Sequence, residues 1–271
     1  MADDPFPIDG KIEIDGEVFE HIGTLKDDAF ARTELVQKDG AKYLFKVSRL
    51  QLVRWPKLRF LMKRLTAREV RIHRLLEGVH GVPKLVKQVS DTSFIREFVD
   101  GRTLDRQPPF IRADFFDEFH QIVKNIHARG VAFVDLAKKE NVVVTTEGRP
   151  FLIDFQVSIS RGRRRLLSIP WNAVVSIMQQ SDIYHVFKHK RRIMPCFLTE
   201  EELRMHARRP WFGVLHKYLF RLPYHLVKRR IIPKHGDSRY PYYEKEGTGK
   251  TEGRRQRLEI RSRKSEAGPR P

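Results

Sequence analysis

The sequence has very little cysteine and too few acidic residues to balance its basic ones. Its single cysteine, Cys196, excludes an intrachain disulfide and a zinc site built from cysteines. Lys and Arg together number 53 against 34 Asp and Glu, a formal net charge of +19. This excess predicts anionic partners: nucleotides, nucleic acids, phospholipids or phosphorylated glycans.

Long hydrophobic runs are missing as well. The longest stretch without a charged residue, Leu166 to Ser181, contains Pro170 and Asn172 and is shorter than the about 20 apolar residues that a membrane-spanning helix needs. The acidic N-terminus, Met1 to Gly10, lacks the basic and apolar regions of a signal peptide. We therefore expect a cytoplasmic protein, with peripheral contact to the inner, anionic face of the cytoplasmic membrane as a further expectation.

Enough apolar residues are present for a substantial core. Hydrophobic residues make up 40% and charged residues 32% of the 271 positions, which excludes both wholesale disorder and a membrane bundle. From Pro233 onward the chain is rich in Gly, Pro, Ser and charge. Residues 234–271 are therefore predicted to form a disordered basic tail.

The first hundred residues predict a small antiparallel sheet with one main helix. Asp39-Gly40 is a strong hairpin signal, because this pair accepts the positive φ values of a type I′ turn. The pattern predicts a helix over Leu58–Leu76, with Thr66 to Glu69 resembling a capping box. The predicted strands are Glu17–Gly23, Ala31–Lys38, Lys42–Val47, Lys84–Ser90 and Phe94–Phe98.

The remainder of the chain is predicted to be mostly helical. Apolar spacing indicates a helix over Asp114–Arg129, with Asp114 as N-cap and Gly130 as C-cap, after a linker or turn that begins at Gly101. A hairpin is expected from Asn141–Thr145 and Pro150–Phe155. Further helices are expected over Ile169–Gln180, Ile183–Lys190, Glu200–Arg208 and Trp211–Ile232.

Five polar residues follow one another in an order that indicates a single site. Lys46 lies inside a predicted strand, Glu69 on the following helix, Asp135 and Asn141 in the loop after the second helix, and Asp154 at the end of an apolar strand. Each residue alone has an ordinary structural explanation. Their order and spacing are what point to a common function, since a hairpin would return Asn141 and Asp154 to one place.

This ordered set resembles the protein kinase-like fold over roughly residues 17 to 200. The resemblance is carried by YLFKV around Lys46, AREVRIHRLL around Glu69, FIREFVDG as fifth strand and hinge, VDLAKKEN as catalytic loop and LIDFQ as the metal-binding segment. It implies an α+β, two-lobed protein. The N-lobe, 11–99, would bind nucleotide through a small antiparallel sheet and one main helix, and the C-lobe, 100–233, would be catalytic and mostly helical.

The resemblance also implies a role for each residue of the set. It implies a phosphotransferase that uses ATP and Mg²⁺, with Mn²⁺ as an alternative ion, because phosphoryl transfer depends mainly on positioning and on cations. Asp135 would align the acceptor hydroxyl and Lys138 or Lys139 would stabilise the transferred group. The implied nucleotide-binding residues are Gly23, Lys46, Glu69, Glu97 and Val99, and the implied metal ligands are Asn141 and Asp154.

Several departures distinguish the chain from ordinary protein kinases. Phe133-Val134 stands where His-Arg is usual, the catalytic loop is one residue longer, Gln156 replaces the glycine of DFG, and Gly23 is all that remains of a glycine-rich loop. These features resemble the minimal lipopolysaccharide-core sugar kinases and the RIO kinases. The acceptor implied is a hydroxyl of a phosphorylated glycolipid or of a protein Ser/Thr.

Basic stretches leave other interpretations open. Arg161 and Arg163 to Arg165 would suit a phosphorylated acceptor or form a solubilising loop, and Arg54 to Arg74, interleaved with aromatic residues, is typical of a membrane-surface helix or of an amphipathic core helix. Two alternative functions are a catalytically impaired pseudokinase scaffold and a basic nucleic-acid-binding protein. Nucleic acid is the less favoured partner, because no stacking-aromatic motif is present.

Overall fold

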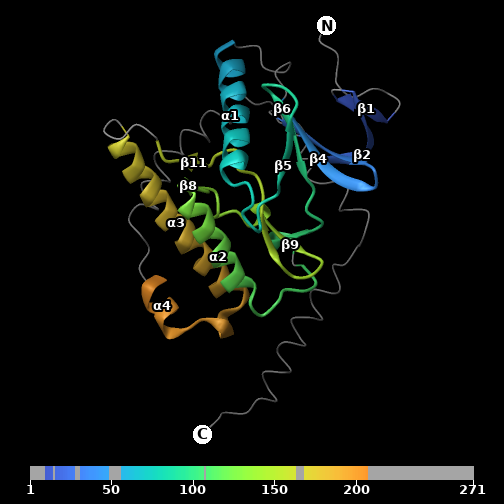
Figure 1. The fold of residues 1–271 in the computed structure, drawn as a ribbon. Coiled ribbons are helices and arrows are strands. Elements are labelled where there is room, and N and C mark those ends of the chain that lie inside the picture. Colours follow the sequence, from blue (N-terminus) through green and yellow to red (C-terminus); the bar gives the residue numbers. More distant parts are fainter. Residues whose placement is uncertain are drawn as a thin grey trace.

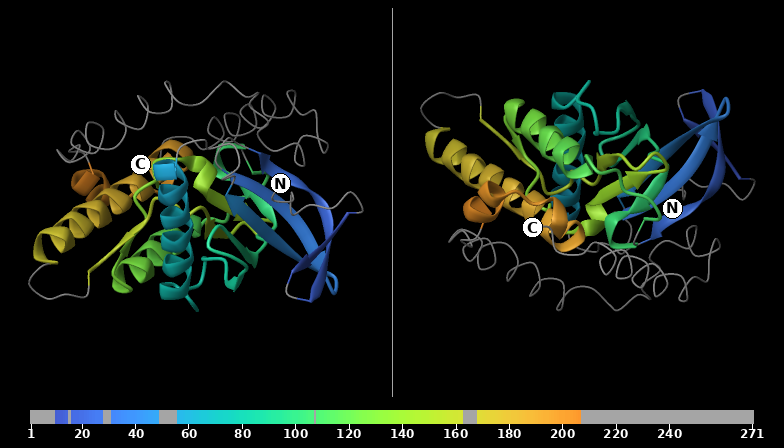
Figure 2. Two further views of the ribbon diagram at one scale, coloured as in Figure 1. Left: turned by 90° about the horizontal axis from the view of Figure 1, so that it is seen from above. Right: turned by 90° about the horizontal axis from the view of Figure 1, so that it is seen from below.

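The protein is α+β, with one antiparallel sheet on one side and most of its helices on the other. The computed structural model describes residues 10–14, 16–27, 31–48, 56–106, 108–162 and 168–206. Helix α1 (Pro56–Leu75), which follows the fourth strand, lies between the sheet and the remaining helices (Figures 1 and 2). This helix is therefore placed to contact both parts.

The main sheet has six strands in the order β1-β2-β3-β4-β6-β5, all antiparallel (Figure 1). Asp39 and Gly40 both have positive φ, 50° and 78°, so the predicted type I′ turn between β3 and β4 is confirmed. The strands are β1 (Lys11–Ile14), β2 (Glu17–Asp27), β3 (Ala31–Lys38), β4 (Ala41–Ser48), β5 (Leu85–Gln88) and β6 (Ser93–Glu97).

The sheet is larger than the sequence pattern predicted. Strand β1 escaped prediction because it is only four residues long, although Ile12 and Ile14 alternate with exposed residues as a half-buried strand requires. Both isoleucines join a core with Phe19, Val36 and Phe45. Strand β2 also continues four residues past Gly23, to Asp27.

Helix α1 (Pro56–Leu75) begins well before the predicted capping box, which is therefore a wrong prediction. Thr66 lies in the middle of the helix, where its hydroxyl donates to the Met62 carbonyl and bonds the Ser48 hydroxyl of β4 at 2.8 Å. A threonine inside a helix can satisfy its hydroxyl in this way on the preceding turn. Thr66, predicted to begin the capping box, thus connects helix α1 to strand β4 by a hydrogen bond.

Helix α2 (Phe115–Ala128) buries a complete apolar face in the second part of the molecule. Asp114 is the N-cap residue, as predicted, but its side chain makes no cap bond, because its carboxylate is held by Arg112 at 2.6 and 2.9 Å. The C-cap is Arg129 and not Gly130 as predicted; Gly130 follows the C-cap with φ 73°, the left-handed conformation common for glycine at that position. The largest core cluster gathers around this helix and includes Phe115, Phe119, Ile126, Phe133 and Phe155.

Two small sheets lie beside α2. The first, in the order β10-β9-β7, contains the predicted hairpin, and the second pairs β11 with β8. Gly101 begins strand β7 and does not lie in the predicted linker or turn; it pairs with Thr145 of β9. A Cβ at this position would come within 2.2 Å of the Val144 carbonyl oxygen, so the close pairing requires glycine. The bounds are β7 (Gly101–Thr103), η1 (Leu104–Arg106), β8 (Val131–Ala132), η2 (Lys139–Asn141), β9 (Val142–Thr145), β10 (Pro150–Leu152) and β11 (Ile159–Ser160).

A single long helix, α3 (Ile169–Ile193), replaces the two helices predicted over Ile169–Gln180 and Ile183–Lys190. Ser181 and Asp182, which separate the two predicted helices, are both buried within the single helix. After it come η3 (Pro195–Phe197) and α4 (Glu200–His206). No helix among the described residues is long and apolar enough to cross a membrane.

Several predictions concern residues outside those described. They are the helix over Trp211–Ile232, the tail 234–271, Arg163 to Arg165 and Arg54. The expected division into 11–99 and 100–233 likewise stays a prediction.

Candidate active site

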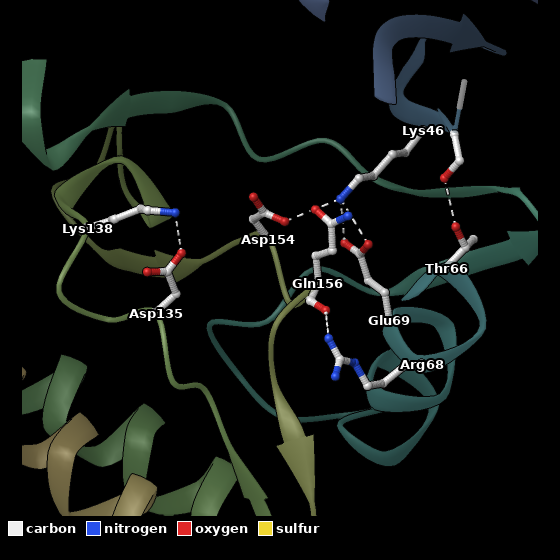
Figure 3. Close-up of polar contacts among 9 residues, drawn as sticks. Lys46, Thr66, Arg68, Glu69, Asp135, Lys138, Asp154 and Gln156 are labelled. Atoms are coloured by element: carbon white, nitrogen blue, oxygen red, sulfur yellow. Dashed lines mark hydrogen bonds and ion pairs between the residues drawn. The ribbon is translucent and has the colours of Figure 1, made fainter. Parts of the chain in front are cut away.

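Three of the predicted site residues lie in direct contact (Figure 3). Lys46 Nζ, on β4, donates to both Oε1 and Oε2 of Glu69 on α1, at 2.9 Å each. The same ammonium lies 3.3 Å from Oδ1 of Asp154, which follows β10. The side chains of Lys46 and Glu69 are only 14% and 3% exposed. Segments 23 and 108 residues apart in the chain therefore meet at one lysine.

Asp154 is the electrostatic centre of this arrangement. Burial by itself would raise its pKa, but Lys46, then Lys26 and Lys138 outweigh burial and hold the pKa far below its usual range. The pKa of Lys46 is raised in turn, because Asp154 and Glu69 more than offset its burial. Asp154 is therefore a carboxylate at any physiological pH. Its φ of 65° is a left-handed value that non-glycine residues seldom adopt.

Asp135 and Lys138 form a second pair on the other side of Asp154 in the view of Figure 3. Lys138 Nζ lies 2.5 Å from Asp135 Oδ2, and the two side chains are 57% and 22% exposed. Lys139 begins η2 and does not contact Asp135 in any bond described here. The pKa of the buried His189 imidazole is lowered first by burial and then by the charge of Lys139. Of the two lysines left open by the sequence, Lys138 is the one that contacts Asp135.

Helix α3 holds the loop that carries Asp135 through hydrogen bonds from the loop backbone to Asp182. Asp182 accepts hydrogen bonds from the backbone N–H of Phe133 at 2.7 Å and of Val134 at 2.9 Å, and its Oδ2 lies 3.1 Å from His127 Nε2. Val134 has φ 73°, a strained value for a β-branched residue. Ser158 adds a bond to the Phe133 carbonyl. The backbone just before Asp135 is thus held in a conformation it would not adopt alone.

Asn141 is hydrogen-bonded to the backbone of Asp135 and of Ile153, the residue before Asp154. Its amide nitrogen donates to the Asp135 carbonyl at 3.1 Å, which leaves its amide oxygen for another partner, and its own carbonyl accepts from Ile153 N at 3.0 Å. Together with Asp154 it supplies two hard oxygen donors, which suit Mg²⁺. Among the described residues no three His, Cys, Asp or Glu side chains form a metal-binding group. One amide oxygen and one carboxylate are ligands for an ion that takes its other ligands from phosphate and water.

Helix α1 is coupled to the segment around Asp154 through more than Glu69. His73, one turn further along α1, packs against the Phe155 ring with centroids 5.1 Å apart, and Phe155 packs on Phe133 at 5.0 Å. Arg68 donates to the Gln156 carbonyl at 2.6 Å. The aromatic contacts link α1 to the residues that follow Asp154 and precede Asp135.

The burial of His73 makes the fold sensitive to acid. Burial above all, and then the charge of Arg96, lower the pKa of His73 from 6.5 to about 3. Between these values the unfolded chain binds a proton that the folded chain does not, so stability falls as the pH drops below 6.5. We expect the melting temperature of His73→Phe, measured from pH 7 to pH 4, to fall less steeply than that of the wild type. Parallel curves would contradict this expectation.

The remaining predicted nucleotide-binding residues lie around the sheet. Gly23 sits inside β2 opposite Leu35, at a register irregularity and not in a loop. Glu97 ends β6, where its exposed carboxylate accepts from Lys84 N at 3.0 Å. Val99 follows in the half-buried segment between β6 and β7. These three residues do not contact Lys46 or Asp154 through any of the polar bonds described above.

Three functional candidates were not predicted. Asp182 had a signal in the sequence, a carboxylate next to apolar helical stretches, but it lies between the two predicted helices and was assigned to neither. Arg96 is buried in β6, and its charge acts on Glu69 and His73. Its signal in the sequence was a charged residue inside a predicted strand, FIREF, as for Lys46 inside YLFKV. The charge of Lys26 acts on Asp154, and a strand irregularity turns Lys26 to the face of Lys46; this irregularity leaves no trace in the residue pattern.

Comparison with known proteins adds no assignment. No protein-family model matches the sequence, and no curated protein shows significant similarity to it. Functional inference therefore depends on the geometry of the site.

Proposed function

We propose that the protein is an ATP- and Mg²⁺-dependent phosphotransferase of the two-lobed protein kinase-like type. The observation that carries this proposal is the contact of Lys46 with both Glu69 and Asp154. A buried lysine oriented by one carboxylate and placed beside a second is suited to hold nucleotide phosphates next to a metal ion. The acceptor class, a phosphorylated glycolipid or a protein Ser/Thr hydroxyl, belongs to the same proposal.

Each residue has a distinct task in this reaction. Lys46, oriented by Glu69, binds the phosphates; Asn141 and Asp154 would hold Mg²⁺, which would neutralise phosphate charge. Asp135 accepts a hydrogen bond from the acceptor hydroxyl and aligns it for in-line attack. Lys138, paired with Asp135 at 2.5 Å, stabilises charge on the transferred group. Asp182 positions the loop without touching substrate.

A transfer assay with γ-labelled ATP and Mg²⁺ tests the proposal. The acceptors offered are the protein itself, a generic basic protein and a lipopolysaccharide extract, and the labelled species distinguishes a glycolipid kinase from a protein kinase. Nucleotide-dependent and Mg²⁺-dependent thermal stabilisation without transfer would favour the scaffold alternative. Absence of both transfer and stabilisation would refute the nucleotide-binding site.

Lys46→Met provides the matched variant for this assay. Removing one preorganised cation from a charged transition state costs about a hundredfold in rate, so we expect a loss of that order. Lys42→Met is the control, because Lys42 is exposed on the same strand. Equal transfer by Lys46→Met and wild type would show that the site is elsewhere.

A further inference from the structure

Strand β2 brings a lysine into line with Lys46. Lys26 pairs with Thr33 of β3, and Thr33 pairs with Lys46 of β4. Residues directly opposite each other on antiparallel strands project from the same face of the sheet. Lys26, Thr33 and Lys46 therefore form one row across three strands, and the row faces Asp154.

A register irregularity in β2 is what places Lys26 in this row. Thr24 pairs with Glu34, so an uninterrupted ladder would put Leu25 opposite Thr33 and turn Lys26 to the other face. The irregularity between Thr24 and Lys26 adds one residue to β2. Leu25 still packs with Leu35 and Leu44 on the Lys46 face, and Lys26 now joins them. Irregularities of this kind commonly re-aim side chains beside active sites.

The charges around Asp154 agree with this placement. Among the lysines that lower the pKa of Asp154, Lys26 ranks directly after Lys46 and ahead of Lys138. Lys46 and Lys26 act on Asp154 from the sheet, and Lys138 acts on it from the loop before η2. In the proposed site the nucleotide phosphates lie against Lys46, so a second lysine in the same row of the sheet suits the phosphates beyond it.

We propose that Lys26 binds the terminal phosphates of the nucleotide and substitutes for the absent glycine-rich loop. The inference rests on the proposed phosphotransferase function and adds to it a residue that binds the terminal phosphates of the triphosphate. A lysine ammonium is a compact point charge on a flexible stem, and it can reach a phosphate from the end of a strand. Backbone N–H groups of a glycine loop are then not required for this contact.

Binding of MgATP, MgADP and AMP to the full-length protein, measured by calorimetry, tests the proposal. For Lys26→Met we expect about a tenfold weaker affinity for MgATP, the size of one lost charge-assisted contact, a smaller loss for MgADP, and none for AMP. Lys26→Arg should restore most of the MgATP affinity. Lys11→Met, an exposed lysine of β1, is the matched control and should bind all three nucleotides as the wild type does.

Two results would overturn the proposal, and they differ in what else they imply. If the wild type binds MgATP and Lys26→Met binds it equally well, the role of Lys26 is refuted while the proposed function stands. If the wild type binds none of the three nucleotides, the proposed function fails and the role of Lys26 fails with it. An equal loss for AMP and MgATP would assign Lys26 to the structure of the strand and also refute the proposal.

Discussion

Asp154→Asn is expected to reduce phosphoryl transfer by about 10³-fold or more, the largest effect on activity that the site predicts. The substitution keeps the size of the side chain and removes the charge that Lys46, Lys26 and Lys138 surround. It also leaves a neutral amide in place of the carboxylate proposed to bind the metal. The measurement is the initial rate of transfer from γ-labelled ATP at saturating Mg²⁺.

An exposed aspartate supplies the control for this experiment. Asp91 is 61% exposed and pairs with Lys63 on the surface of the described residues, so Asp91→Asn should transfer at the wild-type rate. Melting curves of both variants show whether the fold is kept. Transfer by folded Asp154→Asn within a few-fold of wild type would contradict the assignment of Asp154 to the site.

Asp182→Ala is expected to have the largest effect on stability, about 3 kcal/mol of unfolding free energy. Its carboxylate is fully buried and satisfies the N–H groups of Phe133 and Val134 together with His127. Removing it leaves two backbone donors unpaired in the core and frees the strained turn before Asp135. Denaturant unfolding of variant and wild type measures the loss.

Asp182→Asn distinguishes a role of Asp182 in positioning the loop before Asp135 from a role in the stability of the fold alone. The amide oxygen can still accept from one backbone N–H, but an amide has only one oxygen where the carboxylate uses two. We expect a smaller loss of stability, and a fall in the maximal transfer rate with little change in the KM for ATP. A variant that unfolds as easily as wild type and transfers normally would show that the Phe133–Asp135 turn does not depend on α3.

The parts of the fold that the sequence predicted are those where local pattern and packing agree. The Asp39-Gly40 turn, the strand around Lys46 and helix α2 each have a periodicity or turn chemistry that their burial satisfies. The capping box predicted at Thr66 and the separation predicted between the helices Ile169–Gln180 and Ile183–Lys190 were wrong for one reason. Polar residues that usually end helices are here bonded to another element, which no local pattern reveals.

The candidate site shows the same division. The order of Lys46, Glu69, Asp135 and Asp154 along the chain was enough to predict that they would serve one site, and Lys46, Glu69 and Asp154 are in contact. Lys26 could not be predicted, since its place depends on one extra residue in β2. Spacing along a chain reports regular strands, but a bulge changes the face of every residue that follows it.

The conformation of Val134 bears on what shaped this sequence. Left-handed φ values cost a valine on the order of 1–3 kcal/mol, a cost that glycine would avoid. Selection for a durable fold alone would favour glycine at position 134, yet valine stands there, and the buried anchor Asp182 holds it in place. The turn beside Asp135 is thus a point where the chain gives up stability for a defined geometry, the trade-off expected at the proposed site.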